Sequence, residues 1–180
     1  MVHNGTNSRF PSVRLPDDGP ISPEAWSQRP AFGDLTRFWL SRHQMFRDLM
    51  SDLRARLRAC EGGDLDPTDP DTALHRDGRF LCQEMLGHHG VEDSVYFPRL
   101  IVLQPSIAPW IERLHSDHQD IGCSLDRLSQ SLSQVRDGAR AVALVSSRLT
   151  AVMELKLRHM QAEEETVVPV ILTLGEDQLR

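Results

Sequence analysis

The chain has 180 residues, the length of one domain with room for a short extension. Its 26 acidic side chains outnumber 20 lysines and arginines, and the charge of −6 and mean hydropathy of −0.37 exclude a nucleic-acid-binding surface and a membrane span. With no secretory signal and three widely spaced cysteines, neither disulfides nor a cysteine zinc site are expected, so we predict a soluble, reduced, cytoplasmic protein.

Residues 1–33 are predicted to form an irregular N-terminal arm. Five prolines within this stretch exclude a long helix. Ser22 and Pro23 fit the start of one short helical turn, and Trp26 is expected to anchor the arm on the domain. At the other end, residues 174–180 are predicted to form a C-terminal tail.

Four segments between residues 34 and 173 place apolar side chains at alternating steps of three and four residues, which is the spacing of an amphipathic helix. Glycine and proline separate them at Gly62–Gly63, at Pro98 and Pro105, and at Gly138. Four such helices with short connections predict an all-α, up-down-up-down four-helix bundle. The expected buried stripes are Trp39, His43, Phe46, Met50, Leu53 and Leu57; Leu74, Leu81, Met85, His88, Glu92 and Val95; Ile111, Leu114, His118, Ile121, Leu125, Leu128 and Leu132; and Val142, Val145, Leu149, Val152, Leu155, His159 and Glu163.

The two halves of this region, about residues 34–100 and 106–173, repeat one pattern. His88 and His159 are each followed by a glutamate after four residues, an acid after five and a proline after ten. His43 and His118 are each followed by glutamine. We therefore expect two helical hairpins related by a pseudo-twofold axis.

Six titratable side chains interrupt the apolar stripes and are expected to face the core. They are His43, His88, Glu92, His118, His159 and Glu163. Burying such groups without partners is costly, whereas a metal ion would stabilise them together. Imidazole nitrogen and carboxylate oxygen suit iron, manganese or zinc, and a histidine and a glutamate four residues apart share one helix face. The pattern therefore predicts a two-metal site in which the glutamates bridge.

The order of these residues resembles that of the hemerythrin-like family, the HHE cation-binding domains. The resemblance spans residues 34–173, and its residues are His43, His88-His89-Gly90-Val91-Glu92-Asp93 with Phe97-Pro98, Asp117-His118, and His159 with Glu163-Glu164. It implies a non-haem di-iron centre inside a four-helix bundle, with zinc or manganese less expected. His43 and His88 would then bind one iron and His118 and His159 the other, bridged by Glu92 and Glu163.

Two positions depart from the oxygen-carrying hemerythrins. Those proteins have a further histidine four residues before the third-helix histidine, where this chain has Leu114; His115, three residues before, is the alternative ligand. Their fourth-helix carboxylate lies five residues after the histidine, at Glu164 here, whereas the internal repeat favours Glu163. His115 and Glu164 therefore remain candidate ligands, and reversible oxygen carriage is in doubt.

His89, beside the second stripe, is expected to flank the site, either orienting a ligand or standing at its entrance. A dry pocket is expected around the centre. Its lining would be Phe46, Leu81, Met85, Ile121 and Val152.

The function that these features predict is a di-iron protein that reacts with or senses oxygen, peroxide or nitric oxide. Whether it consumes peroxide or nitric oxide as an enzyme is left open. The alternatives are an iron-responsive module acting through a protein partner or a homo-oligomer, an iron-handling protein without turnover, and a structural zinc site, which the two carboxylates disfavour.

Overall fold

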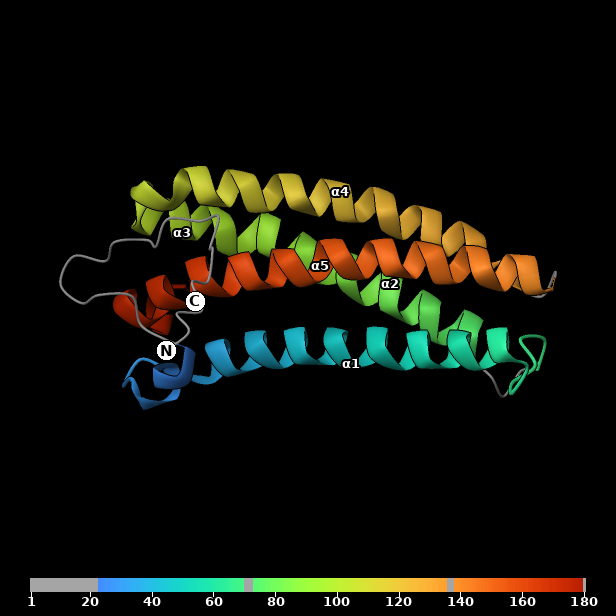
Figure 1. Cartoon of the computed structure of the whole chain (residues 1–180). Coiled ribbons are helices and arrows are strands. Elements are labelled where there is room, and N and C mark those ends of the chain that lie inside the picture. The colour runs from blue at the N-terminus through green and yellow to red at the C-terminus, as the bar shows by residue number, and fades with distance from the viewer. Residues whose placement is uncertain (1–22, 70–72, 136–137, 180) are drawn as a thin grey trace, which may run out of the picture.

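A computed structural model describes residues 23–69, 73–135 and 138–179 (Figure 1). Its four long helices are α1 (Asp34–Gly62), α2 (Leu74–Val91), α4 (Ala108–Leu132) and α5 (Ala139–Leu174). They run alternately in opposite directions, and the neighbouring pairs are α1–α2, α2–α4, α4–α5 and α5–α1. The described residues contain no strand, so the expected all-α helical bundle is confirmed. None of the described helices combines the length and apolar character needed to cross a membrane.

The stripe expected in α1 is buried from Trp39 to Leu57. Together with residues of the other helices, this stripe forms two apolar clusters that fill the bundle. One cluster, including Phe46 and Leu128, occupies the half near the α1–α2 connection, and the other, including Trp39 and Ile171, occupies the opposite half. On α1 and α4 the buried histidine lies in sequence between residues of the two clusters, and on α5 His159 and Glu163 lie where residues of one cluster give way to those of the other, so apolar packing encloses the centre from both sides.

The second predicted helix is divided by a wider turn. After α2 ends, Glu92–Tyr96 form a π-helical segment (η3), and α3 continues over Phe97–Leu103. Because a π turn contains an extra residue, the face that meets the core shifts. Val95, expected in the stripe, is therefore 38% exposed, and Phe97 is buried instead.

Pro98 was expected to end the second helix but does not. Pro98 lies in the first turn of α3, where a missing backbone N–H is tolerated, and this part of the chain stays helical as far as Leu103. Pro169 lies inside α5, which continues to Leu174. The expected break at Pro105 is present, because η4 (Pro105–Ile107) is a separate 3-10 turn.

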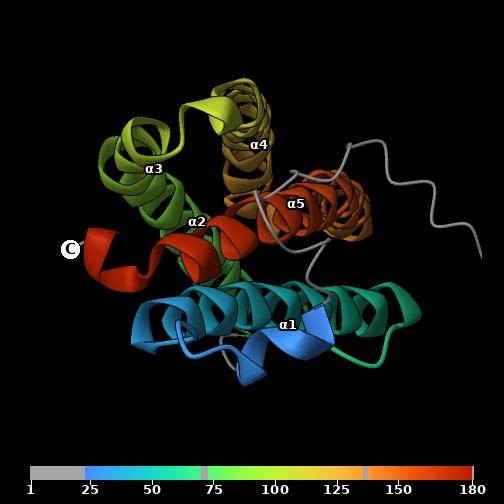
Figure 2. The same cartoon turned by 90° about the vertical axis from the view of Figure 1, so that its left-hand side faces the viewer.

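The segments before α1 and after α5 both pack against the same end of the bundle (Figures 1 and 2). The short helix η1 (Pro23–Gln28) buries Trp26 against Val168 and Leu172, in the anchoring role that the sequence suggested. Residues 1–22 of the expected arm lie outside the described residues. In the region assigned to a C-terminal tail, Glu176–Leu179 form the 3-10 turn η6.

Candidate metal centre

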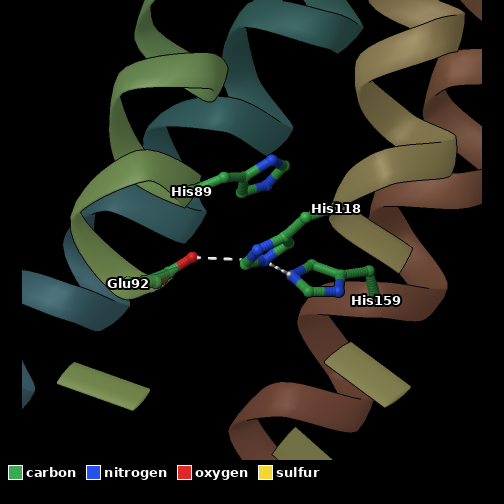
Figure 3. Close-up of side chains that lie close together, drawn as sticks. All are labelled: His89, Glu92, His118 and His159. Atoms are coloured by element: carbon green, nitrogen blue, oxygen red, sulfur yellow. Dashed lines mark hydrogen bonds and ion pairs between the residues drawn. The ribbon is translucent and has the colours of Figure 1, made fainter. Parts of the chain in front are cut away.

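Two groups of side chains meet in the middle of the bundle. The first consists of His43, His88, Glu92 and Glu163, and the second of His89, Glu92, His118 and His159. Within each group, the candidate ligand atoms all lie within 4.8 Å of one another. Figure 3 shows the second group, whose side chains converge from α2, α4 and α5 and from the start of the π segment. All four long helices contribute to the two groups together.

Glu92 is the residue that the two groups share. Its Oε1 lies 2.8 Å from His88 Nε2, in the first group, and its Oε2 lies 3.4 Å from His118 Nε2, in the second. The side chain is 1% exposed. One carboxylate therefore turns one oxygen toward each group, which is the arrangement needed to bridge two cations.

Glu163 faces the centre with one oxygen only. Its Oε2 lies 3.3 Å from His43 Nε2 and 3.2 Å from His159 Nε2. The other oxygen, Oε1, accepts a hydrogen bond of 2.7 Å from the indole Nε1 of Trp39. Trp39, which belongs to the apolar cluster that includes Ile171, thus fixes the orientation of the Glu163 carboxylate.

Most atoms that point into the two groups lack a hydrogen-bond partner. These buried atoms are His43 Nε2, His88 Nε2, His89 Nδ1, Glu92 Oε1 and Oε2, and Glu163 Oε2. Buried polar atoms are normally paired, so a cluster of unpaired acceptors needs an explanation. A cation supplies one, because imidazole nitrogens and carboxylate oxygens are the donors that iron, manganese and zinc accept. The residues present therefore fit a metal centre.

The outward nitrogens of two histidines are held by acidic residues. His43 Nδ1 lies 2.7 Å from Glu164 Oε1, and His118 Nδ1 lies 2.8 Å from Asp93 Oδ1. Metal-binding histidines usually donate their second N–H to a carboxylate in this way, which fixes the ring and its tautomer. Glu164 also accepts a hydrogen bond from Arg47, so it lies behind His43 rather than in either group.

The structure thus distinguishes the candidate ligands. The six residues of the expected stripes all lie in the two groups, whereas Glu164 does not. His115 is also outside them: its side chain is 53% exposed, and its Nδ1 lies 3.1 Å from Asp93 Oδ1. His89, expected to flank the site, is buried inside the second group. The adjacent pair His88-His89 could have indicated the burial of His89. Neighbouring residues are about 100° apart around a helix, so both can lie on the face that meets the core.

Lys156 is the feature that the sequence reasoning missed. The expected stripe contained Leu155, but the fully buried side chain is that of Lys156. Its Nζ lies 2.8 Å from His89 Nε2 and 5.3 Å from the centre of the Phe46 ring. His89 Nε2 is therefore paired, whereas His89 Nδ1 is buried without a hydrogen-bond partner.

Burial sets the charge state of the centre. It lowers the pKa of His88 to about 2, aided by the charge of Lys156, and it lowers the pKa of His118 to about 4, aided by His159. Neutral imidazole is the form that binds a metal. Burial would raise the pKa of Glu163, but His43 and His159 outweigh it and hold that pKa well below its usual range. His88 and His118 are therefore neutral donors and Glu163 is an anion at neutral pH, whereas burial of His43 is outweighed by the charge of Glu163, which raises the pKa of His43.

Burial, followed by the charge of Glu163, raises the pKa of Glu92. The two central carboxylates therefore repel each other when nothing lies between them. A cation between them would relieve this repulsion.

The five residues expected to line a dry pocket are fully buried in the larger apolar cluster, and all have an exposed fraction of 0%: Phe46, Leu81, Met85, Ile121 and Val152. A cavity of about 290 Å³ lies between α1 and α2, with His88 and Glu92 among its lining residues.

The comparison with known families agrees with this geometry. The model of the hemerythrin HHE cation-binding domain matches residues 34–171. The chain belongs to this family. No curated protein and no solved structure matches the chain. The hemerythrin-like domain is a cation-binding domain, and its two buried groups are suited to hold metal.

Proposed function

We propose that this hemerythrin-like domain binds two iron ions and reacts with or senses oxygen, peroxide or nitric oxide. The observation that carries the proposal is the position of Glu92, which turns one oxygen toward each of two groups of buried donors. His43, His88 and Glu163 would complete the first iron site. His89, His118 and His159 would complete the second. When bound, the iron pair supplies redox chemistry toward these small molecules.

The residues around the two groups support this function by orienting the candidate ligands and excluding water. Glu164 and Asp93 orient His43 and His118, and Trp39 orients Glu163. The apolar clusters on both sides exclude water, which strengthens electrostatic interactions at the centre. The cavity beside His88 offers a route for a small ligand. The three free cysteines, Cys60, Cys82 and Cys123, support the proposal that the protein works in the reducing cytoplasm.

Spectroscopy of the iron-loaded protein tests this function. We expect near-ultraviolet and visible charge-transfer bands that change when azide, peroxide or nitric oxide is added. His88→Ala and His159→Ala should each reduce these bands, because each variant removes a donor from one group. The exposed His75 lies outside both groups, and His75→Ala is the matched control. The proposal would be refuted if the bands did not change with any of the three small molecules, or if they were undiminished in both site variants.

A further inference from the structure

The cavity between α1 and α2 reaches from the surface to the centre. At its outer side lie Phe38 and Val91, which are 61% and 48% exposed. At its inner side lie His88 and Glu92 of the first group. A molecule in this cavity would therefore lie directly beside the proposed metal site.

The cavity is too large for a diatomic gas alone. Its volume is about 290 Å³. A single water molecule occupies about 30 Å³ in the liquid, and an apolar cavity of about 150 Å³ is enough to bind benzene. The space therefore matches an organic molecule with one or two rings.

Aromatic side chains form the walls of this space. Trp39 and Tyr96, from α1 and the π segment, have ring centroids 5.1 Å apart with an interplanar angle of 47°. Trp39 also meets His88 edge-on, at 6.4 Å and 79°. Phe38 adds a third ring nearer to the surface. Such walls favour a flat, apolar ligand, since aromatic pairs gain energy from tilted and edge-to-face contact.

The polar lining limits the charge that the ligand can have. The charged residues nearest to the surface, Arg42 and Glu84, are paired with each other at 2.6 Å, so they neutralise each other. At the inner side, His88 Nε2 and both carboxylate oxygens of Glu92 are buried, so they do not face the open space of the cavity. This distribution suits a neutral molecule.

We propose that this cavity binds a neutral aromatic molecule of one or two rings. The proposal rests on the proposed function only in placing this molecule beside iron. It identifies a class of organic ligand or co-substrate for the same centre, in addition to the small oxidants. The aromatic side chains of the walls recognise the rings of this molecule.

Two glycines of α2 provide a matched pair of variants. Gly87 lines the cavity, and a Cβ atom built there meets no other atom within 4 Å. Gly90 is equally open and exposed but does not line the cavity. Gly87→Leu should therefore fill the cavity without a clash, while Gly90→Leu makes the same change elsewhere. Both variants gain helix propensity, so both should fold.

The test is calorimetric titration of phenol and 2-naphthol into the full chain, both without metal and after iron loading. We expect saturable binding that Gly87→Leu weakens at least tenfold and Gly90→Leu leaves unchanged. Benzoate, which has a similar size but a negative charge, should bind at least tenfold more weakly than phenol. No saturable binding, equal affinity in the two leucine variants, or equal affinity for benzoate would overturn the proposal.

Titration of the metal-free protein separates this proposal from that of the iron centre. If the protein binds phenol but holds no iron, the proposed function fails and the cavity site stands. If it binds iron but no phenol, the cavity site fails and the di-iron centre stands. Metal analysis of each titrated sample distinguishes the two results.

Discussion

Lys156 places an amine in the middle of the bundle with no exposed surface. Burial lowers its pKa, and its Nζ contacts His89 Nε2. The outward nitrogens of His43 and His118 meet carboxylates, whereas His89 is the buried histidine that contacts an amine. Burying an amine in an apolar interior costs stability unless hydrogen bonds or ion pairs compensate. Orientation of His89 is the role that the contacts suggest for Lys156.

Lys156→Met should therefore separate stability from metal binding. We expect the metal-free protein to gain about 1–4 kcal/mol in its free energy of unfolding, because an apolar chain of similar length replaces a buried polar group. We expect metal content to fall, because His89 loses the contact at Nε2. Denaturant unfolding and metal analysis of the same samples measure both effects. A loss of stability combined with unchanged metal content would show that Lys156 serves only the fold.

His89 and His115 give a second contrast among residues. His89 is buried within the second group, and His115 is outside both groups with an exposed side chain. Metal analysis should show that His89→Ala loses metal relative to the unmodified protein and that His115→Ala does not. If His115→Ala lost metal and His89→Ala did not, His115 would take the place of the additional third-helix histidine of the oxygen carriers. His89 would then not belong to the second group.

Six core-facing donors could be predicted from the sequence because each replaces an apolar residue in a helical stripe. His89 could not be assigned in this way, since a strict 3.6-residue period puts either His88 or His89, but not both, at the centre of a stripe. Lys156 was missed for a different reason. A lysine beside a leucine is normally the solvated one, and only the packing around His89 and Phe46 reverses this preference.

Among the elements, the π segment determines the geometry of the centre. It begins at Glu92, the carboxylate shared by the two groups, and π turns inside α-helices often mark functional sites. The sequence shows a continuous helical period up to Val95, because no residue type signals the extra residue of a π turn. The bundle was therefore predictable, but the exposure of Val95 and the burial of Phe97 were not.

The contact between α2 and α4 depends on a missing side chain. A Cβ atom at Gly78 would lie 2.5 Å from Cδ1 and 3.2 Å from Cγ of Leu132, which is fully buried. Gly78→Ala should therefore cost about 1–2 kcal/mol, since overpacking exceeds the helix-propensity gain of about 1 kcal/mol.

Gly90→Ala is the control on the same helix. It meets no atom within 4 Å and should stabilise the protein by about 0.5–1 kcal/mol. Thermal unfolding of both variants measures the difference. If Gly78→Ala were also stabilising, the close α2–α4 contact would not exist in solution.

At the scale of the whole molecule, the end of the chain caps its first long helix. The Glu176 carboxylate accepts hydrogen bonds from the backbone N–H of Gly33 at 2.9 Å and of Thr36 at 2.8 Å, and from the Thr36 hydroxyl at 2.7 Å. No side chain within α1 provides a cap at Gly33, so Glu176 satisfies N–H groups that would otherwise lack partners. Residues 143 positions apart thus close the bundle at one end. Such a contact leaves no periodic signal in the sequence.

This cap should make stability depend on pH. Burial would raise the pKa of Glu176, but hydrogen bonds from Thr36, Leu35 and Gly33 outweigh it and lower that pKa. A lowered pKa in the folded state means that the stabilisation is complete above the unfolded value of about 4.3 and is lost as the pH falls through the folded value. Glu176→Gln should therefore cost about 1–2 kcal/mol at pH 7, since it removes charge-assisted hydrogen bonds.

The difference between the two proteins should shrink below about pH 4, where the wild-type carboxylate becomes protonated. Urea unfolding at a series of pH values tests this, and a difference that stays constant from pH 7 to pH 3 would contradict the capping role.

The central claim is that one buried carboxylate, Glu92, joins two metal sites in a single bundle. Its most direct test is the number of iron ions per folded chain, measured by mass spectrometry of the purified protein and of Glu92→Gln. We expect close to two ions in the unmodified protein and clearly fewer in the variant, because the amide removes the shared anionic bridge. One ion or none in the folded, unmodified protein, or two ions in both proteins, would contradict the claim.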